Sequence, residues 1–288
     1  MRDRAAALAY GAGTWSVPVA RDAATVCLLR DTSLGLEVFL MRRTRSMAFA
    51  AGMHVYPGGA VEVSDAGVPR AGHADLVAVG TRLSTAAPAA LLVAAARETF
   101  EECGVLLARS AAGGAPAADL IDAATRDDVA AGRRTFADVL TAYDLVVDDA
   151  ALVPFAHWVT PEVEDRRYDT RFFAAALPVG QRAVQLGGEA DRVGWWLPRV
   201  ALEESLAGRL AMLPPTVATL EVLAESGSVA DALEMVAALD VVPTLPHPYP
   251  GGSPGAVEWH LVHARTRELL DGVGEPHASE TDGVGGSA

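Results

Sequence analysis

The sequence has few cysteines, few aromatic residues and fewer basic than acidic side chains. Two cysteines, Cys27 and Cys103, occur among 288 residues, so we expect no disulfide framework and a reducing, cytoplasmic setting. Lys and Arg number 23 against 37 Asp and Glu, which gives a formal net charge of -14. A general basic surface for nucleic acid is excluded, because neutralising phosphates requires clustered Lys and Arg. An anionic small molecule would need a local basic group, a bound cation, or both.

Long hydrophobic runs are also missing. The longest apolar stretch, residues 86–96, is far shorter than the roughly 18 to 20 residues that span a bilayer. The apolar part of the amino-terminal segment is short, Ala-rich and interrupted by Gly11 and Gly13, so we predict no export signal. We therefore expect a soluble globular protein with no membrane partner.

Strand-like and helix-like segments alternate along the chain. Residues 25–30 and 36–41 predict two strands of a hairpin, joined by turn-forming residues. Further strands are predicted at 153–159 and 171–177, and further helices at 118–143, near 202–206 and near 217–225. This mixture favours an α/β fold in a single domain, residues 1–270. Residues 271–288 are rich in Gly, Ser and acidic residues, so we expect a disordered tail.

The clearest helix is predicted over residues 89–103. Pro88 suits its first turn and Gly104 the position just past its last turn. The preceding segment, 66–88, is rich in glycine and proline and is predicted to be an inserted loop. Three roles stay open for this insert: a lid, a contact in a homodimer, or tolerated extra length.

One face of the predicted helix is acidic. Glu98, Glu101 and Glu102 lie within a sector of about 100°, while the opposite side is suited to packing. Like charges at these spacings each cost roughly 0.2 to 0.5 kcal/mol, and only Arg97 is placed to relieve them, by pairing with Glu101. Convergent carboxylates are the ligands that Mg²⁺ or Mn²⁺ prefers. An ordinary solvated helix face is the alternative interpretation.

A glycine-containing turn is predicted at residues 56–59, Tyr-Pro-Gly-Gly. Because glycine has no Cβ, the backbone there can come close to a ligand or an ion. His54, just before this turn, is expected to pack or to form a hydrogen bond rather than to act as a base. Cys103 lies on the packed side of the helix and is expected to be a small buried hydrophobe.

Two separated motifs carry a resemblance to a known family. Residues 97–105, Arg-Glu-Thr-Phe-Glu-Glu-Cys-Gly-Val, resemble the second half of the Nudix box, and Gly58-Gly59 resembles its opening. The box is split, because 31 residues separate Asp65, in the position of an early glutamate, from Arg97. Thr99 also stands where an aliphatic residue is usual. The interruption, together with residues 167–173 and 213–216, is similar to the branch that includes peroxisomal coenzyme A diphosphatases.

This resemblance implies a fold and an activity. The expected fold is a Nudix-type α/β/α sandwich with a mixed sheet, insertions and a helical carboxy-terminal part. The expected activity is Mg²⁺-dependent (or Mn²⁺-dependent) hydrolysis of a diphosphate linkage in a nucleoside diphosphate derivative, best matched by coenzyme A or acyl-coenzyme A. The alternatives are an ADP-ribose or NADH pyrophosphatase, because the box does not encode the flanking group, and a nucleotide-sensing domain without catalysis, because the insert could shift the glycine loop.

The resemblance also implies roles for the acidic helix. Glu98, Glu101 and Glu102, with the carbonyl of Gly58, would hold the metal ions as the catalytic centre. Arg97 would belong to this centre by holding a neighbouring carboxylate in place. Asp65 would either assist the metal-bound waters or simply cap a turn.

Substrate binding is assigned to arginines. Arg42, Arg43 and Arg171 are candidates to contact phosphates, because the guanidinium fork suits them. Solvated surface arginines are the alternative interpretation.

Overall fold

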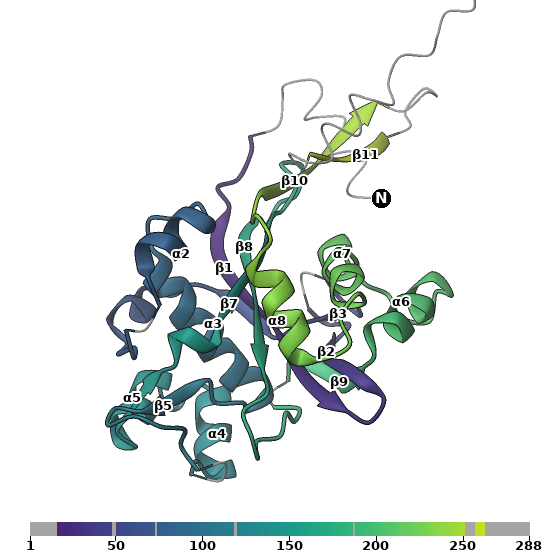
Figure 1. Cartoon of the computed structure of the whole chain (residues 1–288). Coiled ribbons are helices and arrows are strands. Elements are labelled where there is room, and N and C mark those ends of the chain that lie inside the picture. Colours follow the sequence, from purple (N-terminus) through teal and green to yellow (C-terminus); the bar gives the residue numbers. More distant parts are fainter. Residues whose placement is uncertain are drawn as a thin grey trace, which may run out of the picture.

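The computed structural model describes residues 16–47, 50–72, 74–117, 120–186, 188–250 and 257–262 (Figure 1). The strands are Arg21–Thr32 (β1), Gly35–Arg43 (β2), His54–Val55 (β3), Gly58–Ala60 (β4), Ala108–Ser110 (β5), Leu145–Val147 (β6), Val153–Val159 (β7), Tyr168–Ala176 (β8), Ala190–Trp196 (β9), Pro243–Pro250 (β10) and Val257–Val262 (β11). The helices are Val63–Gly67 (η1), Leu76–Arg82 (α2), Pro88–Cys103 (α3), Ala123–Ala130 (α4), Phe136–Ala142 (α5), Asp149–Ala151 (η2), Pro198–Leu206 (α6), Pro214–Leu223 (α7) and Val229–Ala237 (α8).

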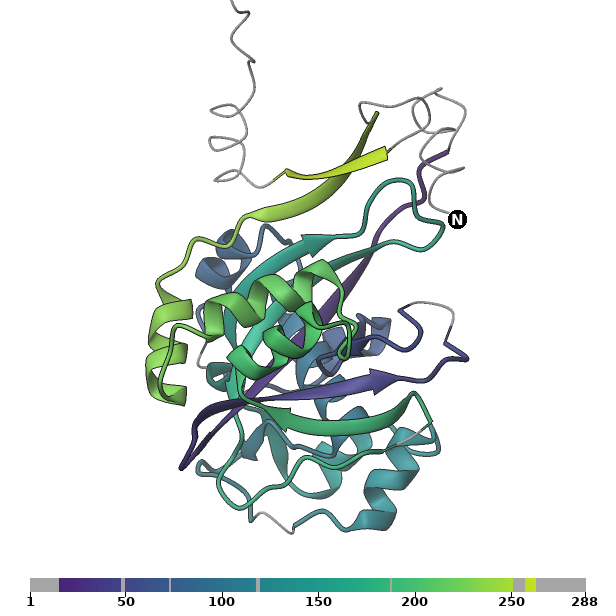
Figure 2. The ribbon, with the colours of Figure 1, turned by 90° about the vertical axis from the view of Figure 1, so that its right-hand side faces the viewer.

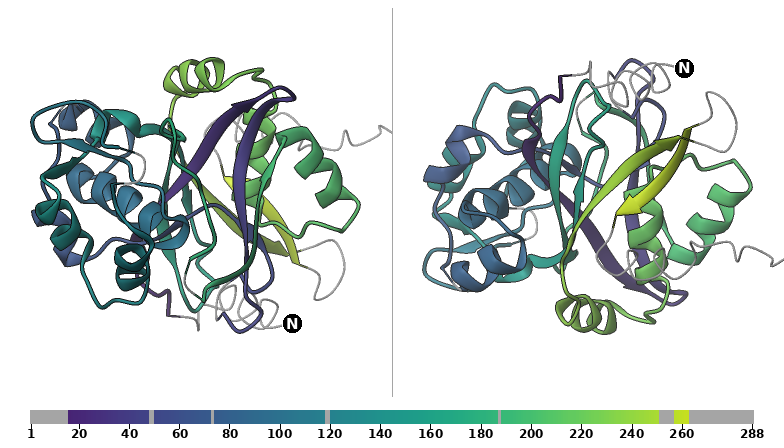
Figure 3. Two further views of the ribbon diagram at one scale, coloured as in Figure 1. Left: turned by 90° about the horizontal axis from the view of Figure 1, so that it is seen from below. Right: turned by 90° about the horizontal axis from the view of Figure 1, so that it is seen from above.

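A mixed sheet forms the middle layer. Its order is β11-β10-β7-β8-β1-β2-β3, with β4 paired to β1 and β9 paired to β2. The β1–β8 and β10–β7 pairs are parallel, and β1–β2 and β7–β8 are antiparallel. Helices α2 to α5 cover one face and α6 to α8 the other (Figure 3). The predicted α/β fold with a mixed sheet and a helical carboxy-terminal part is confirmed.

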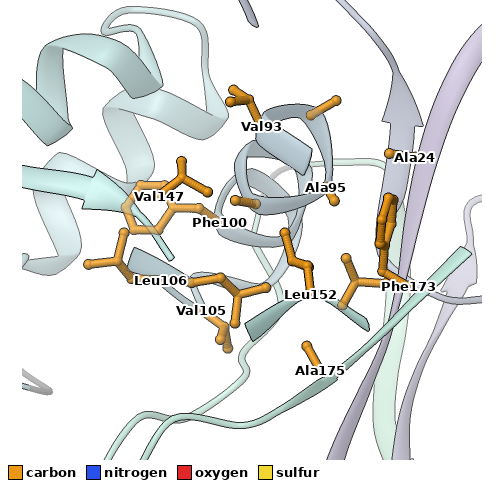
Figure 4. Close-up of a cluster of buried hydrophobic side chains, with 14 of the residues drawn as sticks. Ala24, Val93, Ala95, Phe100, Val105, Leu106, Val147, Leu152, Phe173 and Ala175 are labelled. Atoms are coloured by element: carbon orange, nitrogen blue, oxygen red, sulfur yellow. The ribbon is translucent and has the colours of Figure 1, made fainter. Parts of the chain in front are cut away.

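Alternating side chains of β1 pack into two separate hydrophobic cores. Val26 and Leu28 join the core under α3, whereas Cys27 and Leu29 join the core on the opposite face. This division follows from the two-residue repeat of a strand. On the α3 side, Phe100 packs in a cluster that reaches the sheet (Figure 4).

The ends of α3 match the prediction. Pro88 occupies its first turn, and Gly104 ends it in the left-handed conformation, at φ 70°, with its N–H donating to the Phe100 carbonyl. Thr99, where the family favours an aliphatic residue, is fully buried, and its hydroxyl donates to the Ala95 carbonyl over 2.7 Å. The hydroxyl is therefore satisfied inside the helix.

Some predicted boundaries were wrong. The insert 66–88 is not a simple loop, because α2 forms within it and is capped by Asp75, whose side chain accepts from two backbone N–H groups. The single helix predicted over 118–143 is two helices, since Gly132, at φ 68°, lies in the turn between them. The turn predicted at 56–59 ends in a short strand, β4. The prediction for 271–288 lies outside the described residues.

Other predictions hold. The hairpin is β1 and β2, and β7 and β8 match the further strands closely. The helices predicted near 202–206 and 217–225 are α6 and α7, while β9 and α8 were not anticipated. In the part of the chain that the structure describes, no helix combines the length and the apolar character needed to cross a bilayer.

Candidate active site

The glycine pair of β4 lies against the acidic face of α3. The Gly58 N–H donates to Glu102 Oε2 over 2.8 Å. A Cβ built on Gly59 would lie under 3.0 Å from the Glu98 carboxylate, and one built on Gly58 would be as close to Thr25 of β1. Both positions therefore require glycine, because any side chain would displace either the carboxylate or the strand.

Arg97 joins the two halves of the box. Its guanidinium is 5% exposed and donates to Asp65 Oδ1 over 2.8 Å, to Glu98 Oε1 over 2.8 Å and to Glu101 Oε2 over 3.1 Å. It also donates to the Ala60 carbonyl at 2.9 Å. The predicted Arg97–Glu101 pair is confirmed. Helical spacing predicted Glu101 as the partner of Arg97 and did not predict Glu98, but the guanidinium reaches both carboxylates.

Asp65 has a structural task. It is 1% exposed, and both of its oxygens accept from Arg97. Oδ2 also accepts from the Glu62 N–H over 2.7 Å, which closes the capping box of η1. The turn-capping interpretation is confirmed, and the same carboxylate fixes the position of Arg97.

The cluster carries more negative than positive charge. Burial raises the pKa of Glu101 to about 7 even though Arg97 opposes the shift. Burial likewise raises the pKa of Glu98, and burial together with the charge of Glu98 raises that of Glu102 well above its usual range. Burial alone would lower the pKa of Arg97, but the surrounding carboxylates raise it. One arginine therefore serves several carboxylates, and a cation would stabilise the ionised set.

The donor set suits a divalent cation. Glu98, Glu101 and Glu102 each have one oxygen held by Arg97 or by the Gly58 N–H, and no hydrogen bond is recorded among the described residues for the other oxygen. Those free carboxylate oxygens and the excess negative charge fit Mg²⁺ or Mn²⁺. Within the described ranges, no three acidic, His or Cys side chains form a ready-made metal cage. The role predicted for the Gly58 carbonyl stays a prediction.

The three predicted substrate arginines lie apart. Arg43 is near the glutamates, since its charge lowers the pKa of Glu102. It reaches Glu189 only at 3.4 Å, and its buried Nε has no hydrogen-bond partner. Arg42 projects from the other face of β2. Arg171 is 3% exposed and pairs with acidic side chains and with carbonyls of the insert, so the structure does not bring it to the cluster.

Two side chains match their predicted structural roles. His54 is 7% exposed, and its Nδ1 lies 3.3 Å from the Ala211 carbonyl. Cys103 is fully buried, its thiol donates to the Thr99 carbonyl, and burial raises its pKa.

Sequence reasoning missed Glu189. This exposed carboxylate precedes β9, and its charge helps to raise the pKa of both Glu98 and Glu102. Its backbone carbonyl accepts from the Thr44 N–H over 2.8 Å, which holds it beside β2. No motif marks it, because only the pairing of β9 with β2 brings it to the site.

Comparison with known proteins decides the family. The family model described as the NUDT19 Nudix domain matches residues 80–223, half of the chain. The chain belongs to the Nudix hydrolase family. A crystal structure of a Nudix hydrolase from Alicyclobacillus acidocaldarius is similar to this Nudix chain, with a TM-score of 0.61 and 30% identity over 76% of this chain and 97% of that one. Nudix hydrolases generally use divalent metal ions and act on diphosphate bonds.

Two similar proteins, from human and chicken, carry the same name. The chain is 28% identical to acyl-coenzyme A diphosphatase NUDT19 of Homo sapiens over 79% of this chain and 70% of that protein. It is 30% identical to the protein of the same name from Gallus gallus, over 62% of this chain and 58% of that protein. The matched region thus spans 70% of the length of the human relative and 58% of that of the chicken relative.

Proposed function

We propose that this Nudix hydrolase cleaves the diphosphate linkage of coenzyme A or acyl-coenzyme A with a bound Mg²⁺ or Mn²⁺. The observation that carries the proposal is the cluster of Glu98, Glu101 and Glu102 against the glycines of β4, with Arg97 as its one direct arginine partner among the described residues. The names of the human and chicken relatives support the choice of substrate.

The protein's own groups prepare this site. Glu98, Glu101 and Glu102 would hold the cation, since each has a carboxylate oxygen that neither Arg97 nor the Gly58 N–H engages. When bound, the cation neutralises the diphosphate and lowers the pKa of the attacking water. Arg97 fixes the orientation of Glu98 and Glu101, and the Gly58 N–H does the same for Glu102. Carboxylates whose orientation is already fixed need not rearrange as charge develops during the reaction.

Arg43 is the proposed contact for the diphosphate. Its side chain lies beside the glutamates, and its long contact with Glu189 holds it only loosely. A guanidinium in this state can exchange a weak partner for two phosphate oxygens. The substrate-binding role of Arg171 stays a prediction, and its buried ion pairs favour a structural role instead.

The proposed reaction is a hydrolysis that splits the substrate into two phosphorylated products. Water adds its oxygen to one phosphorus of the linkage, the bond from that phosphorus to the bridging oxygen breaks, and the bridging oxygen leaves on the other phosphate. Coenzyme A then yields adenosine 3′,5′-bisphosphate and 4′-phosphopantetheine, and acyl-coenzyme A yields the acylated form of the latter.

Product identification tests the proposal. The full chain is incubated with coenzyme A, an acyl-coenzyme A, ADP-ribose and NADH, each with Mg²⁺ and with a chelator, and the products are identified by mass spectrometry. We expect metal-dependent cleavage of the two coenzyme A compounds. Cleavage of ADP-ribose or NADH alone would replace the substrate class. Nucleotide binding with no cleavage across the panel would favour the sensor interpretation.

A further inference from the structure

A row of basic side chains crosses three strands at the far end of β2. Arg42 lies opposite His54 of β3 and opposite Arg192 of β9 in the strand register. Directly opposed residues share one face of a sheet, with Cβ atoms about 4.5 to 5.5 Å apart, and like charges there are destabilising. Burial lowers the pKa of His54, and both arginines act on it in the same direction, which supports their closeness.

The charges in this row do not balance. Arg42 pairs with Asp191 over 2.6 Å. Arg192 is exposed and also acts on Asp191, whose pKa its charge lowers, so two arginines share this one carboxylate. A positive charge thus stands directly beside another one in a chain whose formal net charge is -14. Such a local arrangement is suited to an anionic ligand.

The row borders a small cavity. Its volume is about 140 Å³, and its lining comes mainly from β2 and β9. Figure 2 shows these two strands side by side. The cavity is lined by Leu40, His54, Arg192, Val193, Gly194, Trp195 and Trp196. Gly194 lies opposite Leu40 in the register, and a Cβ there would come 3.4 Å from Trp196 Nε1. The missing side chain of Gly194 therefore keeps this surface open.

His54 supplies a directional polar group to the cavity. It is 7% exposed, and its Nδ1 is assigned as the donor to the Ala211 carbonyl at 3.3 Å. In the neutral ring, Nε2 is then a hydrogen-bond acceptor, and no partner for it is recorded among the described residues. The cavity thus combines the guanidinium group of Arg192, an acceptor nitrogen and an apolar wall formed by Leu40 and Trp196. Arg42 lies beside this cavity in the strand register.

We infer that this cavity binds the phosphorylated adenosine end of the substrate, an inference that rests on the proposed function. Arg42 and Arg192 contact the 3′-phosphate, and His54 Nε2 accepts from an amino or hydroxyl group of the nucleoside. Leu40 and Trp196 provide apolar surface for the purine. The site differs from the Arg43 contact, which lies on the opposite face of β2 and serves the diphosphate.

The cavity is within reach of the glutamates. His54 and Gly58 are four residues apart, so their Cα atoms are separated by at most about 14 Å. In coenzyme A a single ribose, esterified at its 5′ oxygen, connects the base to the diphosphate. Because the two sites lie on opposite faces of β2, one substrate molecule occupies both only if it passes the carboxyl end of this strand, where Arg42 and Arg43 lie.

Binding of the two product halves tests the inference. Isothermal titration with adenosine 3′,5′-bisphosphate and, separately, with 4′-phosphopantetheine is done in a chelator, so that no metal contributes. We expect Arg192→Leu to weaken binding of the bisphosphate about tenfold or more, as loss of a charge-assisted contact does. Binding of phosphopantetheine is expected to stay unchanged. Gly194→Ala, which fills part of the cavity, is expected to weaken only the bisphosphate.

A matched control removes an arginine elsewhere. Arg133 forms an exposed pair with Asp128 at 2.7 Å, much as Arg42 does with Asp191, and Arg133→Leu is expected to bind both compounds like the wild type. Thermal unfolding of each variant verifies that it is folded.

The outcomes separate this inference from the proposed function. Wild-type affinity of Arg192→Leu for the bisphosphate, a loss of phosphopantetheine binding instead, or no binding of the bisphosphate to the wild type each overturns the inference. If coenzyme A is still cleaved in those cases, the proposed function stands. If the bisphosphate binds as expected but coenzyme A is not cleaved, the cavity stands and the reaction fails.

Discussion

The acidic face of α3 and the basic row across β3, β2 and β9 both place like charges side by side, but they differ in burial. The glutamates are largely buried, and burial raises the pKa of all three. In the basic row, Arg192 is exposed and Arg42 is partly neutralised by Asp191. Buried carboxylates demand a compact ion of high charge, whereas an exposed arginine pair suits a hydrated anion. In the proposed function the first region would serve chemistry, and the second would serve recognition.

The largest expected effect comes from removing the positive charge of Arg97 from the acidic region. Arg97→Met leaves Asp65, which is 1% exposed, without its partner. Because an unpaired buried charge is costly, the free energy of unfolding should fall by about 3 to 5 kcal/mol. Urea unfolding at pH 7 measures it. Arg133→Met, at an exposed pair, should change stability by less than about 0.5 kcal/mol. Equal effects of the two substitutions would contradict the central role of Arg97.

Removing one charge from the glutamate cluster should affect catalysis more than folding. Glu101→Gln keeps the shape but removes a carboxylate from the proposed metal site. We expect kcat/KM for coenzyme A to fall at least about 100-fold, because even groups that only support a metal ligand contribute 10- to 100-fold. Steady-state kinetics over a range of Mg²⁺ measures the change. The control is Glu203→Gln, at an exposed position on α6. Undiminished turnover by Glu101→Gln would show that Glu101 does not belong to the metal site.

The ion-paired cluster around Asp169 gives a reference for both regions. Asp169 accepts from His157 and pairs with Arg171 at 2.9 Å. Burial acts to raise the pKa of Asp169, but His157 and Arg171 lower it below its usual value. The stability it contributes is therefore present above the unfolded pKa of about 3.9 and is lost as pH falls through the lower folded pKa.

Asp169→Asn should thus lower the free energy of unfolding by about 1 to 2 kcal/mol at pH 7. The difference from the wild type should shrink as the pH falls below about 4. Urea unfolding across this range tests both points, with the exposed Asp128→Asn as control. Because Asp169 already has His157 and Arg171 as partners, Mg²⁺ and nucleotides should leave the difference unchanged. A ligand-dependent difference would show that this cluster belongs to the site.

The smallest expected effect is a gain in stability, in contrast to the losses expected for Arg97→Met and Asp169→Asn. Arg192→Ala removes one of two opposed positive charges, so the ligand-free protein should become more stable by about 0.2 to 1 kcal/mol. Differential scanning calorimetry should show a higher Tm, and adenosine 3′,5′-bisphosphate should reduce or reverse this advantage. Arg166→Ala, at another exposed position, should not show the reversal. Lower stability of Arg192→Ala without ligand would argue against strain in the basic row.

The two regions also differ in how far the sequence predicted them. The glutamates share one helix, so their common face follows from local periodicity, and the caps at Pro88 and Gly104 fixed its ends. The basic row joins residues 42, 54 and 192, which only strand pairing brings together. Of these, Arg42 was expected to bind substrate, His54 to pack, and Arg192 was not considered. Strand register is a tertiary property, and β9 itself was not anticipated.

The insert was predicted poorly for a related reason. Its glycines and prolines indicate a loop, yet the seven-residue helix α2 forms between them. The polar contacts that hold the insert, such as Arg171 with the Leu83 and Ser84 carbonyls, link positions almost 90 residues apart. The sequence pattern alone does not show them.

Arg97 contacts Ala60 and Asp65 before the interruption of the box and Glu98 and Glu101 after it. The chain between η1 and α3 thus begins and ends at anchored points, whatever its own length. The spacing between the two halves of the proposed site is therefore set by this one guanidinium and not by the path of the chain between them. The intervening segment still has packing of its own to keep, because Leu83 is fully buried in the core on the α3 side.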